Sequence, residues 1–146
     1  MDTVFAALRE DHDLHRSLME QIVETSGDSK TREHHFQQLK TELLNHAKAE
    51  ERTFYAPLLA DKSLQHLATH SLVEHEELEE LIAELEQTEM SSPNWLKRFK
   101  HLQHRVEHHE SEEEKEVFPV AGKMLTEAQK KSFAEDYKKA MTEEAK

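Results

Sequence analysis

The chain has 146 residues, of which 34% are charged and 6% aromatic, with two glycines and three prolines. Such a composition, rich in helix formers and poor in turn residues, predicts a single all-α domain with a sizeable core. The net charge of −12 disfavours nucleic acid and anionic membrane surfaces as partners, and the absence of cysteine excludes disulfides and thiolate ligands. No apolar run approaches the roughly 18 residues that span a membrane. The first residues do not resemble a secretory signal, so we expect a cytoplasmic protein.

The first half of the chain predicts a helical hairpin. Asp2 or Thr3 can cap a first helix, which we expect to end at the loop formed by residues 25–30. A second helix is expected over about 31–55, because Pro57 marks its approaching end.

The second half predicts a matching hairpin. After a turn at 60–63, a third helix is expected to extend to about residue 88. Ser92 and Pro93 form a helix-start signal for a fourth helix, which closes near Pro119. Four long helices joined by short loops predict an up-down-up-down four-helix bundle.

The end of the chain predicts an additional short C-terminal helix. The sequence TEAQ at 126–129 fits a capping box, in which the first and last side chains cap each other's backbone. We therefore expect residues 1–125 to form the bundle and residues 126–146 to form a C-terminal helix and tail.

A histidine motif occurs twice. His46 stands four residues before Glu50, and His108 stands four residues before Glu112. A proline follows each histidine at a distance of eleven residues. Acid-His-acid triplets centred on His12 and His75 are separated by nearly the same interval as the two motifs. These spacings indicate two copies of one hairpin, related by a pseudo-twofold axis.

The spacing predicts a metal centre inside the bundle. Residues i and i+4 lie on one face of a helix, so each motif can direct both side chains at one site. The predicted metal ligands are His12, His46, Glu50, His75, His108 and Glu112. Two carboxylates bridging two ions would give each ion two imidazoles and two oxygens, a ligand set that suits iron, manganese or zinc.

A simpler interpretation applies to single motifs, because His-x-x-x-Glu recurs by chance in a chain with 12 histidines and many acids. We expect a second group of histidines on the surface: His34, His35, His66, His101 and His109. His15 and His104 lie one turn from the predicted ligands His12 and His108. Each could be a further ligand or a hydrogen-bond partner of a ligand.

With these motifs, residues 4–121 resemble the hemerythrin-like HHE cation-binding family. The resemblance implies a non-heme di-iron centre with two bridging glutamates and an oxo or hydroxo bridge, with manganese or zinc as alternative metals. It further implies that the protein binds or senses oxygen, nitric oxide or redox state. A di-iron oxidase, a peroxide-consuming enzyme and an iron- or metal-handling protein are the alternatives; the resemblance favours a binding protein over an enzyme.

The chain departs from the hemerythrin pattern at two places. Ser71 stands where hemerythrin has a histidine four residues before the ligand that matches His75. One ion would then either have fewer protein ligands or use His70, Glu74 or His104. Hemerythrin also places its last carboxylate five residues after the histidine, which would select Glu113, whereas the internal repeat favours Glu112.

Overall fold

The computed structural model describes residues 3–145. The predicted cap at Asp2, and the outer ends of the predicted segments 1–125 and 126–146, lie outside the described residues. The all-α prediction is confirmed, because every regular element in the described range is helical. The elements are α1 (Val4–Val23), α2 (Lys30–Glu50), η1 (Glu51–Tyr55), α3 (Ala56–Leu59), α4 (Gln65–Glu86), α5 (Pro93–Glu112), η2 (Glu113–Val117), α6 (Phe118–Met124) and α7 (Glu127–Glu144). The segments η1 and η2 are single π-helical turns.

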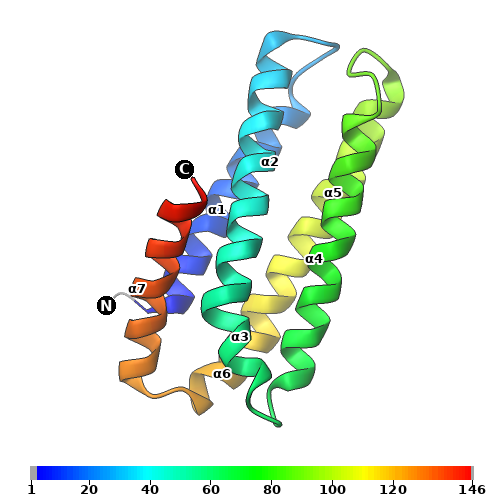
Figure 1. Cartoon of the computed structure of the whole chain (residues 1–146). Helices are drawn as coiled ribbons and strands as arrows, with labels where there is room; N and C mark the ends of the chain where they lie inside the picture. Colours follow the sequence, from blue (N-terminus) through cyan, green and yellow to red (C-terminus); the bar gives the residue numbers. More distant parts are fainter. Residues whose placement is uncertain (1–2, 146) are drawn as a thin grey trace.

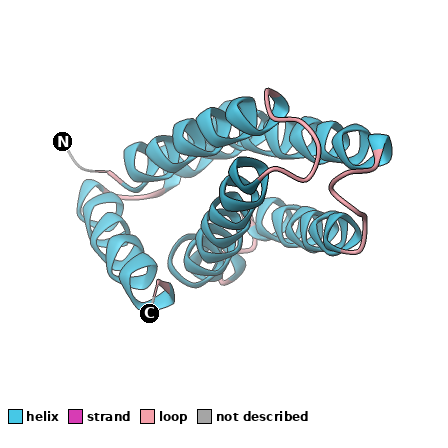
Figure 2. Ribbon diagram, turned by 90° about the horizontal axis from the view of Figure 1, so that it is seen from above, coloured by secondary structure: helices cyan, strands magenta, loops and turns pink. Residues whose placement is uncertain are grey.

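Four long helices form the predicted bundle. In Figure 1, α1, α2, α4 and α5 lie side by side, and the loops that follow α1 and α4 are at the same end. The C-terminal helix α7 packs outside the bundle against α1 and α2. Viewed from above, α7 occupies one flank of the molecule (Figure 2). Within residues 3–145, no helix combines the length and the hydrophobicity needed to span a membrane.

Local capping explains where several helices begin. Four of them start after a hydroxyl side chain that accepts a backbone N–H, namely Thr3, Ser29, Ser92 and Thr126. Pro93 occupies the first turn of α5, where the lack of an N–H costs nothing. Thr126 and Gln129 form the predicted capping box.

The two long helices that precede a proline do not stop at it. The helix continues two residues past Pro57, to Leu59, and five residues past Pro119, to Met124. Proline would clash with the carbonyl four residues earlier in an α-helix, and a π turn, which is wider, sits just before each proline. Both π turns lie at the level of the bundle where polar side chains are buried.

The core consists of two apolar clusters with a polar band between them. One cluster, towards the α3, α6 and α7 end, includes Leu8, Phe54, Tyr55, Leu58 and Phe118. The other, towards the hairpin loops, includes Met19, Phe36, Ile82, Trp95 and Phe99. Between them, each long helical rod contributes buried polar residues: His12, His15, His46, Glu50, Glu74, His75, His109, Glu110 and Glu113. Packing at both ends thus buries the polar band and shields it from water.

Candidate metal centre

The apolar stripe of α5 decides which of its polar side chains face the interior. Buried residues follow one another at intervals of three and four, which is the spacing of one helix face. They are Trp95, Phe99, Leu102, Val106, His109 and Glu113. On the other helices, His12, His46 and His75 likewise lie on the buried face. The apolar periodicity therefore also decides which polar side chains face the interior.

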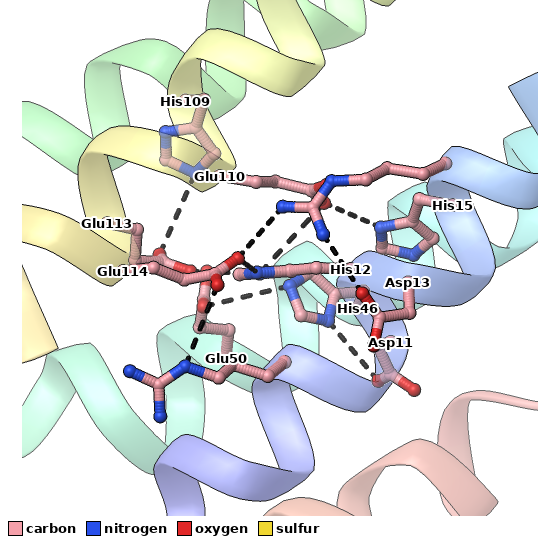
Figure 3. Close-up of polar contacts among 12 residues, drawn as sticks. Asp11, His12, Asp13, His15, His46, Glu50, His109, Glu110, Glu113 and Glu114 are labelled. Atoms are coloured by element: carbon pink, nitrogen blue, oxygen red, sulfur yellow. Dashed lines mark hydrogen bonds and ion pairs between the residues drawn. The ribbon is translucent and has the colours of Figure 1, made fainter.

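A first group of possible metal ligands comes from α1, α2 and η2. One donor atom from each of His12, His46, Glu50 and Glu113 lies within 4.8 Å of all the others. Nε2 of His12 is 3.1 Å from Oε1 of Glu113, and Nε2 of His46 is 3.7 Å from Oε2 of Glu50. Figure 3 shows these side chains converging from α1, α2 and η2. Together they offer two imidazole nitrogens and two carboxylates.

A second group lies beside the first and shares Glu50 with it. Donor atoms of Glu50, His75 and His109 are also within 4.8 Å of one another. Nε2 of His75 lies 3.2 Å from Oε1 of Glu50 and 3.2 Å from Nε2 of His109. Nε2 of His109 is 3.7 Å from Oε2 of Glu113, so Glu113 also extends towards this group.

The carboxylates of Glu50 and Glu113 each contact one histidine of the first group and one of the second. Glu50 presents one oxygen to His46 and the other to His75. Glu113 presents one oxygen to His12 and the other to His109. A carboxylate whose oxygens face different imidazoles is arranged to bridge two cations.

Several of the converging atoms have no hydrogen-bond partner among the described residues. These atoms are both oxygens of Glu50, Oε1 of Glu113 and Nε2 of His12, and all of them are buried. Leaving buried polar atoms unpaired is costly, and bound cations would satisfy them. Imidazole and carboxylate donors without thiolate suit iron, manganese or zinc, so the residues present fit metal ions of this kind.

The electrostatics of the polar band favour positive charge. Burial and the neighbouring Glu113 carboxylate raise the pKa of Glu50 well above its ordinary value. Burial works against ionisation of Glu113 too, but contacts with His12 and His109 lower its pKa below its ordinary value. The pKa of His12 rises to about 10, because its contacts with Glu113 and Glu110 outweigh burial. Without another cation, the band therefore retains protons to balance its carboxylates.

Each of the four histidines in the two groups has a carboxylate near its Nδ1 atom. Nδ1 of His12 is 2.8 Å from Glu114, and Nδ1 of His109 is 2.7 Å from Glu74. The other two pairs are His46 with Asp11, at 3.3 Å, and His75 with Glu51, at 3.4 Å. Because an ionised carboxylate only accepts, the hydrogen bonds of His12, His46 and His109 place the proton on Nδ1 and leave the Nε2 lone pair directed inward, as metal-binding histidines require.

The C-terminal helix joins this outer layer of contacts. The hydroxyl of Tyr137 donates a hydrogen bond to Asp11 and lies 2.5 Å from Nδ1 of His46. The hydroxyl can therefore accept from His46 while it donates to Asp11. Burial lowers the pKa of His46 to about 4, so this imidazole is neutral near pH 7, the form that binds metal ions.

The structure brings together four of the six predicted ligands: His12, His46, Glu50 and His75. It places the other two, His108 and Glu112, outside the buried groups, which corrects the sequence prediction. The side chain of His108 is 52% exposed and contacts Glu112 at 3.1 Å on the outside of α5. One residue turns a helix by about 100°. The adjacent His109 and Glu113 therefore face the interior instead, and the expectation that His109 lies on the surface is wrong.

A uniform repeat interval could have found the pair that faces the interior. His12 and His75 are 63 residues apart, and the same interval separates His46 from His109 and Glu50 from Glu113. The carboxylates behind the histidines follow it as well: Asp11 with Glu74, and Glu51 with Glu114. The two prolines are only 62 residues apart, and they suggested His108 and Glu112.

The remaining candidates occupy different environments. His15 is buried one turn from His12, and its Nδ1 lies 2.6 Å from Oε2 of Glu110. His104 is exposed. Near the substituted position Ser71, which is buried, the hydroxyl of Tyr55 donates a hydrogen bond to Glu113. A tyrosine hydroxyl thus fixes the carboxylate that faces both groups.

Comparisons with known proteins identify the family and the fold. The family model described as the hemerythrin HHE cation binding domain matches residues 3–121. A crystal structure of a hemerythrin HHE cation binding domain-containing protein from Mycobacterium kansasii superimposes with a TM-score of 0.88 at 24% sequence identity, over 99% of this chain and 88% of that one. At this identity the likeness shows the fold alone. A search of curated proteins gave no match. The chain belongs to the hemerythrin HHE cation-binding family, and its buried histidine and glutamate groups form a potential metal centre.

Proposed function

We propose that this protein holds two iron ions in the polar band and uses them to bind or sense a small ligand such as oxygen or nitric oxide, or the redox state. His12 and His46 would hold one ion, and His75 and His109 the other. Glu50 and Glu113 would be shared between them. The observation that carries the proposal is that both carboxylates direct their two oxygens at different histidine pairs.

The donor count supports an ion pair with room for a ligand. Two imidazoles and one oxygen from each carboxylate give every ion four protein donors, and iron commonly accepts more. The iron pair would supply redox chemistry and open coordination positions. The protein supplies the orientation, because a carboxylate behind each imidazole fixes its inward direction.

Burial favours a ligand of a few atoms. His12 and Glu50 are fully buried, and the Glu113 side chain is 1% exposed. Phe118 stacks on the His12 ring, with 6.3 Å between ring centroids. A bulky substrate would have to separate the helices to reach these atoms, whereas a diatomic molecule needs far less space. This supports binding or sensing of a small molecule over turnover of a large one.

The test is metal analysis together with an optical spectrum of protein purified under iron-replete conditions. We expect two irons per chain and near-ultraviolet absorption of a bridged ferric pair, with a reversible change on cycles of reduction and exposure to oxygen or nitric oxide. Glu50→Gln should abolish the absorption, and the exposed Glu80→Gln should leave it unchanged. One zinc ion per chain, or no bound metal, would contradict the proposal. Sustained consumption of peroxide with many turnovers would favour the enzyme alternative instead.

A further inference from the structure

A separate set of donor atoms lies on the flank formed by α4 and α5. His70, Glu74 and Glu112 place one donor atom each within 4.8 Å of the other two; we refer to these three residues as the outer cluster. Nε2 of His70 is 2.8 Å from Oε1 of Glu112 and 3.5 Å from Oε1 of Glu74. The His70 side chain is 57% exposed, so ions from solvent can reach the cluster.

The three members of the outer cluster belong to two His-x-x-x-Glu pairs on neighbouring helices. His70 and Glu74 are one turn apart on α4, and His108 and Glu112 are one turn apart on α5. Nε2 of His108 lies 3.1 Å from Oε2 of Glu112, whereas His70 contacts the other oxygen of this carboxylate. Glu112, which the sequence repeat predicts for the interior, thus belongs to this cluster, and His108 lies beside it.

The internal repeat does not account for the outer cluster. The interval of 63 residues relates Glu74 to Asp11, but it relates His70 to Ala7 and Glu112 to Ala49, which carry no donor atoms. On the first hairpin, the hydroxyl of Tyr137 on α7 contacts Asp11. On the second hairpin, an imidazole and a second carboxylate take that place beside Glu74.

We propose that the outer cluster is a third cation site, which binds a divalent transition-metal ion such as Zn²⁺ through His70, Glu74 and Glu112. One imidazole with two carboxylates is a mixed nitrogen and oxygen donor set, which suits zinc, iron or manganese better than calcium or magnesium. Arg105 approaches the far oxygen of Glu74, at 3.9 Å, and offsets part of the negative charge. The exposed position makes this ion exchangeable, unlike ions held in the buried band.

Glu74 connects the outer cluster to the buried centre. Its Oε1 lies 2.7 Å from Nδ1 of His109, whose Nε2 faces the interior. An ion in the outer cluster would therefore share a carboxylate with a histidine of the buried band. The proposal does not depend on which metal, if any, the buried band holds.

The test is equilibrium dialysis of the full chain against Zn²⁺, followed by metal analysis of wild type and two matched variants. His70→Ala removes an exposed ligand, and His101→Ala removes an exposed histidine two turns before His108 on α5. Wild type and His101→Ala should bind one more Zn²⁺ per chain than His70→Ala. In His70→Ala the affinity for this ion should be at least about tenfold lower. Glu112→Gln should reproduce the loss. Equal Zn²⁺ binding by wild type and His70→Ala would overturn the proposal.

Two further measurements separate this proposal from the proposed function. In Glu50→Gln, which disrupts the buried band, the ion that depends on His70 should remain, and its loss there would contradict a separate site. Anomalous X-ray scattering from crystals soaked in Zn²⁺ should place a peak between His70 and Glu112. A peak only in the buried band would overturn the outer site while leaving the buried centre intact.

Discussion

The hydroxyl of Tyr137 lies 2.5 Å from Nδ1 of His46, although 91 residues separate the two in the chain. This contact ties the C-terminal helix α7 to an inward-facing histidine of α2. The family match ends at residue 121, so α7 lies beyond the matched segment. Tyr137 is nevertheless buried and also donates to Asp11. Helix α7 thus completes the outer layer of contacts around the buried band.

Replacing Tyr137 with phenylalanine should weaken metal binding without disturbing the packing of the ring. The change removes the hydroxyl that holds His46, and changes in such supporting contacts typically reduce metal affinity about 10–100-fold. Competition with a chromogenic chelator measures the affinity. Ser132→Ala, an exposed position on α7, is the control. Equal affinities of wild type and Tyr137→Phe would show that α7 does not support the centre.

Removing the metal should destabilise the folded chain. Several converging atoms of the buried band, among them both oxygens of Glu50 and Nε2 of His12, have no hydrogen-bond partner among the described residues, so ions that bind only the folded state add their binding free energy to stability. Thermal unfolding followed by circular dichroism should give a lower midpoint after treatment with a strong chelator, and iron should restore it. A midpoint independent of the chelator would argue against ions in the band.

Glu50→Gln should have opposite effects on the metal-free and the metal-loaded protein. Glu50 is fully buried, and both its oxygens lack hydrogen bonds among the described residues. In chelator, a neutral amide at this position should raise the free energy of unfolding by about 1 kcal/mol or more, because Glu50, whose pKa is raised by burial, no longer has to take up a proton when the chain folds near pH 7. Denaturant titration measures this change. With iron present, the variant should lose the stabilisation that wild type gains; a variant less stable than wild type in chelator would contradict the argument.

Arg32 should matter for stability and not for metal binding. Its guanidinium donates to the carbonyls of Thr25 and Met90, each at 2.8 Å, and lies 4.6 Å from the Trp95 ring centroid. The side chain therefore joins the loops of the two hairpins. Arg32→Lys cannot make both bonds in the same geometry and should lower the free energy of unfolding by roughly 2 kcal/mol. Denaturant unfolding checks this, with the exposed Arg98→Lys as control and unchanged iron content in both variants.

Much of the fold follows from local sequence signals. The starts at Ser92 and at Thr126 are predictable because a cap depends on residues three or fewer positions away. The bundle follows from apolar periodicity and short loops. The docking of α7 through Tyr137 does not, because it depends on contacts between residues far apart in the chain.

The candidate site shows the same division. His46 and Glu50 are the one His-x-x-x-Glu pair on α2, so the pattern identifies them without ambiguity. On α5 and η2, two such pairs overlap, beginning at His108 and at His109, and the pattern cannot separate them. The proline favoured the wrong pair, because Pro57 follows its glutamate by seven residues and Pro119 follows Glu113 by six. The two pairs can be told apart only by finding which side of the helix packs against the core, and His109 lies on that side.

The most direct test of the account compares two adjacent histidines, His108 and His109. Each is replaced by asparagine, and the iron that remains bound after gel filtration is measured together with the near-ultraviolet spectrum. We predict that His109→Asn loses at least one of two irons and the bridged-pair absorption, whereas His108→Asn retains both. If His108→Asn lost the iron and His109→Asn kept it, the centre described here would be in the wrong register.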